Sequence, residues 1–97
     1  MSNSPAKQRG VHVVIRGRVQ GVFFRAGAQE QARTLGVTGW IQNQSDGSVA
    51  AVFEGDQEAI SQILSWCKVG SPSSRVDSVE SKDIAYTGGF DRLETRY

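Results

Sequence analysis

The sequence predicts an α+β sandwich, in which two helices cover one face of an antiparallel four-stranded sheet. Three observations lead to this prediction. Four segments are rich in β-branched or alternating apolar residues, two segments carry apolar residues at helical spacing, and turn-forming residues separate them. The segments follow the order strand, helix, strand, strand, helix, strand, and residues 93–97 allow a short fifth edge strand.

The length of the chain sets the domain organisation. A chain of 97 residues suits one domain, because it buries roughly 60–70% of the surface that it exposes when unfolded. Residues 1–9 are polar and contain Pro5, so we interpret them as a flexible N-terminal tail without the apolar centre of a signal peptide. Residues 10–97 are then expected to form the single domain.

The first half of that domain predicts a strand and a helix. Residues 11–16 are rich in β-branched side chains, which is typical of a strand. A helix is expected over residues 26–35, and Gly36 stands where a C-terminal glycine cap belongs. The apolar residues that recur at helical spacing there are Phe24, Ala28, Ala32 and Leu35.

The second half predicts a hairpin, a helix and a further strand. Residues 37–44 and 48–54 fit two strands, joined by the turn signal Ser45-Asp46-Gly47. Asp56 is an expected helix N-cap, and Gly70 and Pro72 end that helix before a strand over residues 75–84. The helix carries the clearest apolar stripe in the chain, formed by Ile60, Ile63, Leu64 and Cys67.

This order of elements is the split βαβ pattern of the ferredoxin-like fold. In that fold the first two strands run parallel and the third lies between them. The loop after the first strand and Asn43, near the end of the second, are therefore expected at the same sheet edge. Two strand spacings separate them, which is roughly 10 Å.

The loop itself predicts an anion site. Residues 17–25 read Gly-Arg-Val-Gln-Gly-Val-Phe-Phe-Arg, between a strand and a helix start. Converging backbone N–H groups and a helix N-terminus favour an anion there. Arg25 in the first helical turn opposes the helix dipole, which makes sense if an anion lies between it and the loop. The spacing alone leaves open an ordinary glycine turn with a solvated arginine.

Two linked motifs resemble those of the acylphosphatase family. Residues 17–25 are similar to the family signature, and residues 39–43 followed by 46–49 are similar to its second motif. The resemblance runs from about residue 11 to residue 97. It implies a hydrolase that cleaves the carboxyl-phosphate bond of small acyl phosphates to a carboxylate and inorganic phosphate, with that phosphate as product and competitive inhibitor.

The resemblance also implies the site residues. Arg25 and Asn43 form the catalytic pair, in which Arg25 holds phosphate and Asn43 orients the attacking water. No metal or cofactor is implied. The chain departs from the commoner family pattern at Phe23, where many members carry glycine, and at Ala26, where a larger residue is frequent. The implied phosphate-binding residues are Val19, Gln20, Gly21, Val22, Phe23, Phe24 and Arg25.

Composition excludes several other classes. A formal net charge of +1 argues against an electrostatic nucleic-acid binder. No apolar run approaches the ~20 residues that a membrane span needs. His12 is the only histidine and Cys67 the only cysteine, so no zinc set exists; we interpret His12 as a sheet residue and Cys67 as a core residue. We expect a cytoplasmic monomer.

Two rival functions stay open at this stage. RNA-recognition domains share this order of elements but place exposed aromatic residues on the two central strands. Here the first strand has none and the third offers only Phe53. The other rival is a non-catalytic ferredoxin-like domain that binds an anion or a protein. Trp40 is expected to pack on the sheet, with shielding of the site as the alternative.

Overall fold

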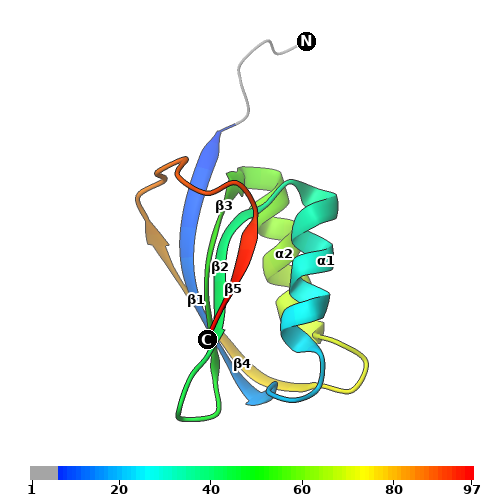
Figure 1. Cartoon of the computed structure of the whole chain (residues 1–97). Coiled ribbons are helices and arrows are strands. Elements are labelled where there is room, and N and C mark those ends of the chain that lie inside the picture. The colour runs from blue at the N-terminus through cyan, green and yellow to red at the C-terminus, as the bar shows by residue number, and fades with distance from the viewer. Residues whose placement is uncertain (1–6) are drawn as a thin grey trace.

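All the predicted elements form, and two helices cover one face of a five-stranded sheet (Figure 1). The computed structural model describes residues 7–97. In chain order the elements are β1 (Gln8–Arg18), α1 (Phe24–Leu35), β2 (Thr38–Asn43), β3 (Val49–Asp56), α2 (Gln57–Val69), β4 (Arg75–Ile84) and β5 (Leu93–Arg96).

The order of strands across the sheet is β4-β1-β3-β2-β5. β3 pairs antiparallel with both β1 and β2, so these two strands run parallel with β3 between them, as predicted. The short fifth strand also forms. It pairs parallel with β2, and Gln42 lies opposite Arg96. The chain end after β5 therefore lies at the same sheet edge as Asn43.

The core lies between the sheet and the helices. Val11, Val13 and Ile15 of β1 are fully buried, whereas His12 and Val14 between them face the open side of the sheet and are only partly buried. Both helical stripes point inward as predicted. The buried helical residues are Phe24, Ala28 and Ala32 of α1 and Ala59, Ile60, Ile63 and Cys67 of α2.

The boundaries of two elements differ from the prediction. β1 begins at Gln8, because Gln8 pairs with Asp56 and the Arg9 guanidinium lies 3.0 Å from the Asp83 carboxylate. The N-terminal tail was expected over residues 1–9, but residues 8 and 9 belong to β1. Residues 1–6 lie outside the described residues. α1 begins at Phe24 instead of residue 26, because the Gly27 N–H donates to the carbonyl of residue 23.

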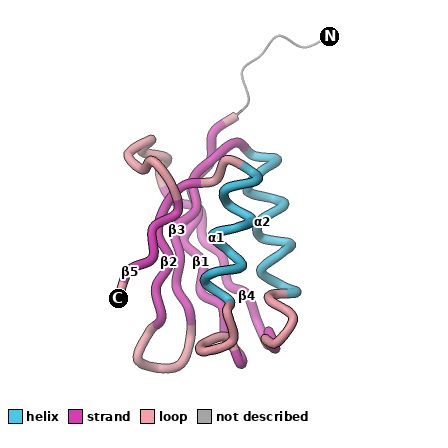
Figure 2. The backbone as a smooth tube through the Cα atoms, turned by 45° about the vertical axis from the view of Figure 1, so that its right-hand side comes forward, coloured by secondary structure: helices cyan, strands magenta, loops and turns pink. Residues whose placement is uncertain are grey.

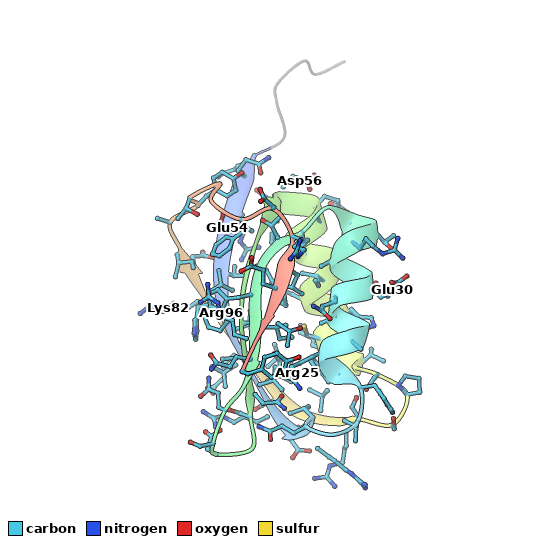
Figure 3. All side chains as sticks on the ribbon, in the orientation of Figure 1. Arg25, Glu30, Glu54, Asp56, Lys82 and Arg96 are labelled. Atoms are coloured by element: carbon cyan, nitrogen blue, oxygen red, sulfur yellow. The ribbon has the colours of Figure 1, made fainter. Side chains whose placement is uncertain are left out.

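One buried carboxylate was not anticipated from the sequence. Glu54 of β3 is fully buried and accepts hydrogen bonds from the Thr87 N–H (3.1 Å), the Thr87 hydroxyl (2.9 Å) and the Gly88 N–H (2.9 Å). These bonds fasten the connection between β4 and β5 to the sheet, beside Glu54 in Figure 3.

Candidate active site

Three connections lie at one end of the molecule: the β1–α1 loop, the β2–β3 hairpin and the α2–β4 loop (Figure 2). β1 reaches this end through a break in its register with β4 at Arg16 and Gly17. Gly17 has a φ of 132°, and a Cβ there would lie 2.2 Å from the Arg75 carbonyl oxygen. Only glycine permits this close approach, which directs the chain into the loop.

The β1–α1 loop has the backbone of an anion-binding nest. Gly21 and Phe23 are left-handed, with φ of 72° and 63°, and Val22 between them is not. Phe24 then starts the right-handed helix. Alternation of this kind turns successive N–H groups toward one point and attracts anions, as does the helix N-terminus that follows. The left-handed Phe23 also explains why glycine suits this position.

A pocket of about 310 Å³ opens beside this loop. It brings together five of the seven predicted phosphate-binding residues and also Asn43. Gln20 and Val22 do not line it. The lining residues are Val19, Gly21, Phe23, Phe24, Arg25, Ala26, Gln29, Asn43, Thr95 and Tyr97.

The Gln20 side chain fastens the loop to the hairpin. Its amide nitrogen donates to the carbonyl oxygens of Gln44 (2.7 Å) and Ser48 (2.8 Å). These carbonyls flank the turn that follows Asn43. Of the Gln20 groups, only the backbone N–H is therefore left as a candidate for contact with phosphate.

Asn43 lines the pocket and carries an unpaired side-chain acceptor. It follows Gly39 and Ile41 on the helix-facing side of β2. Its Oδ1 is buried and has no hydrogen-bond partner among residues 7–97. The turn after it is closed by other groups, since the Gln44 N–H donates to the Ser48 carbonyl and the Ser48 N–H and hydroxyl donate to Asp46.

Arg25 supplies the positive charge of the pocket. Its side chain is half-buried in the first turn of α1, between that helix and the end of β5 (Figure 3). The guanidinium carbon lies 5.3 Å from the centre of the Tyr97 ring, a cation–π contact. Within the described part of the chain, no carboxylate forms an ion pair with Arg25.

Four lining residues were not predicted as site residues, and one of them, Ala26, directly follows Arg25. Thr95 and Tyr97 belong to β5 and the chain end, and reach the pocket because β5 runs parallel to β2. Gln29 projects from α1, and its amide donates to the Leu93 carbonyl at 3.2 Å. Thr95 and Tyr97 carry no sequence signal of their own, because the direction of the edge strand is known only from its pairing with β2.

The weaker candidates lie elsewhere, as predicted. His12 and Trp40 contact each other edge to face on the open side of the sheet, with ring centres 6.1 Å apart, and neither lines the pocket. The shielding role for Trp40 is therefore not supported. Burial raises the pKa of the Cys67 thiol to about 12, which fits a core residue. Among residues 7–97, no three His, Cys, Asp or Glu side chains gather to hold a metal ion.

Comparison with known proteins places the chain in a family. Residues 11–95 match the acylphosphatase family model. An acylphosphatase of Pelotomaculum thermopropionicum is 49% identical over 79 residues, covering 81% of this chain and 86% of that protein. One of Syntrophobacter fumaroxidans is 48% identical and covers 93% of each chain. The solved acylphosphatase of Coxiella burnetii superposes with a TM-score of 0.88 at 31% identity, covering 99% of this chain and all of that one. The family model, these relatives and the ferredoxin-like fold show that the chain belongs to the acylphosphatase family.

Proposed function

We propose that this chain hydrolyses acyl phosphates in the pocket between the β1–α1 loop, the start of α1 and the end of β2. The observation that carries the proposal is the buried, unpaired Oδ1 of Asn43, which shares one pocket with the nest and with Arg25. The substrate brings its own activated bond, because its carboxylate leaving group is a weak base. The protein then needs mainly to position the reactants and stabilise charge.

The loop and Arg25 would hold the phosphoryl group. Its equatorial oxygens accept from N–H groups of residues 19–25, and the guanidinium grips them with two parallel donors. The electrostatics favour this assignment, since among the described residues no acidic side chain lines the pocket. The hydrogen bonds from Gln20 to the β2–β3 hairpin would keep the β1–α1 loop at a fixed distance from Asn43.

Asn43 would orient the attacking water. Its Oδ1 accepts a hydrogen bond from the water and directs it in line with the leaving carboxylate, which is a proximity effect. An amide takes up no proton, and the pocket lining described here contains no carboxylate or histidine side chain. The proton of the water therefore passes to a phosphate oxygen, and the carboxylate leaves without a general acid.

The two rival functions are less well supported. Phe53, the one aromatic candidate on β3, is fully buried in the core and presents no ring to RNA. A non-catalytic anion-binding domain would need Arg25 and the nest, but it gives no reason for an unpaired acceptor in the same pocket.

Replacement of Arg25 by glutamine tests the proposal. We expect Arg25→Gln to lower turnover of acetyl phosphate by about 10²–10³-fold or more and to weaken binding of inorganic phosphate, because a charged contact to the transition state is lost. Arg18→Gln is the matched control, since Arg18 is exposed and does not line the pocket. Both are assayed with chelator present. A folded Arg25→Gln protein with near-normal turnover contradicts the mechanism.

We further propose that the protein works as a cytoplasmic monomer. A single chain supplies every lining residue of the pocket, so the site needs no second copy. The buried Cys67 thiol suits a reducing compartment. No helix within residues 7–97 is long and apolar enough to cross a membrane. Sedimentation and cell fractionation test these two points, and a stable dimer or a membrane-bound pool counts against them.

A further inference from the structure

The α2–β4 loop (residues 70–74) presents two hydroxyls to one carbonyl of the β1–α1 loop. The Ser71 hydroxyl donates to the Val22 carbonyl oxygen at 2.7 Å, and the Ser73 hydroxyl donates to the same oxygen at 3.3 Å. Ser71 is only 6% exposed, and Val22 is 7% exposed. A buried carbonyl needs such partners. Two donors on one oxygen also fix the direction in which that carbonyl points.

The direction of the Val22 carbonyl determines that of the next N–H. The peptide bond between Val22 and Phe23 is trans, so its C=O and N–H point to opposite sides. With the carbonyl turned toward residues 70–74, the Phe23 N–H is turned away from them. Phe23, Phe24 and Arg25 all line the pocket proposed to hold phosphate. Because Phe23 precedes the first helical residue, its N–H has no partner within the helix.

This peptide orientation is a strained one. Phe23 has φ 63° and ψ 23°, a left-handed conformation that is unfavourable for a residue with a Cβ. Rotation of the Val22–Phe23 peptide changes φ of Phe23 and relieves the strain. It also turns the carbonyl oxygen to the side that the Phe23 N–H had faced, where it would repel an anion held by that N–H. The hydrogen bonds from Ser71 and Ser73 oppose that rotation.

We propose that Ser71, assisted by Ser73, is a positioning residue for phosphate binding, which holds the Phe23 N–H toward the anion. The inference rests on the proposed function, because it assigns the β1–α1 loop to phosphate. The turn itself is well braced, since the Ser74 hydroxyl donates to the Ser71 carbonyl at 2.7 Å. Ser74 thus supports the same turn, and among residues 7–97 its hydrogen bonds go to Ser71 and not to the β1–α1 loop.

The test compares Ser71→Ala with Ser74→Ala. We expect Ser71→Ala to raise the Kd for inorganic phosphate and the KM for acetyl phosphate about three- to tenfold, the size of one lost hydrogen bond. We expect Ser74→Ala to lower the melting temperature about as much as Ser71→Ala does, but to leave the phosphate Kd unchanged. Calorimetric titration with phosphate and thermal unfolding separate these two effects.

A double-mutant cycle with Phe23→Gly tests the orientation itself. Glycine adopts positive φ without penalty, so the peptide no longer needs the serine to stay in place. We expect Ser71→Ala to weaken phosphate binding less in the Phe23→Gly background than in the Phe23 background. A serine that only stabilises the α2–β4 loop would weaken binding equally in both backgrounds.

The outcomes separate this inference from the function on which it rests. A wild-type protein that binds no phosphate overturns both. Arg25-dependent phosphate binding with an unchanged Kd in Ser71→Ala, or with equal losses in both Phe23 backgrounds, overturns the inference alone. If Ser71→Ala does not fold, Ser73→Ala replaces it, with an expected two- to threefold rise in Kd. An unchanged Kd in that variant overturns the inference equally.

Discussion

Truncation of Asn43 to alanine separates the orientation of water from the binding of phosphate. Asn43 lines the pocket, its buried Oδ1 is unpaired among residues 7–97, and the hydrogen bonds that close the β2–β3 turn come from other groups. We therefore expect Asn43→Ala to lower kcat about a hundredfold or more, the size of a lost transition-state contact. The Kd for phosphate should stay nearly unchanged, because kcat falls alone when only the transition state loses an interaction.

The structure also fixes the expected change in stability. A buried acceptor without a protein partner destabilises the fold by about 1–3 kcal/mol. A water molecule that donates to this acceptor reduces that cost. Removal of the acceptor should leave the melting temperature unchanged or raise it. If Asn43 instead capped the hairpin, its loss would cost about 1 kcal/mol. For a domain of this size that is a fall of roughly 4–8 °C.

The assay measures three quantities on one variant: kcat with acetyl phosphate, the phosphate Kd by calorimetry, and the melting temperature by circular dichroism. Gln44→Ala is the control, because Gln44 is the next residue, is exposed, and does not line the pocket. A lower melting temperature with normal kcat per folded molecule would remove Asn43 from the mechanism. A large rise in phosphate Kd would show that Asn43 binds phosphate instead of orienting the water.

Three further predictions concern parts of the fold outside the pocket. Glu54→Ala leaves the N–H groups of Thr87 and Gly88 without their acceptor, so we expect a loss of about 2–4 kcal/mol and a melting temperature lower by some 10–20 °C; an unchanged value contradicts the role of this carboxylate. Cys67, whose pKa burial raises to about 12, should resist alkylation at pH 8 in the folded protein and react in denaturant, as mass spectrometry can follow; rapid labelling of the native protein contradicts its burial. The hydroxyl and N–H of Ser48 lower the pKa of Asp46 below its ordinary value of 3.8, so its stabilisation is present above that pH and is lost as the pH falls through the lower folded-state pKa. Thermal unfolding of wild type and Asp46→Asn should therefore differ at pH 6 and converge in strong acid, and a constant difference contradicts this linkage.

Local pattern was enough to predict the elements, whereas the resemblance to the family motifs supplied Arg25 and Asn43 as the proposed site residues. Helical spacing of apolar residues located both helices, and the Asp56 cap is present, with its carboxylate accepting from the Ala59 N–H at 2.8 Å. The order of elements then placed Arg25 and Asn43 at one end of the sheet. These inferences hold because periodicity, capping and chain connectivity act over short stretches of sequence.

Only the tertiary structure decided how the pocket is completed. The Ser71–Val22 bond, which holds the β1–α1 loop, joins residues 49 positions apart. The parallel pairing of β5 with β2 brings the Tyr97 ring over Arg25, and the left-handed turn at Phe23 aims the loop. None of these has a local signature. Each depends on which backbone groups and rings meet once the sheet has formed, and a four-residue edge strand carries no pattern that states its direction.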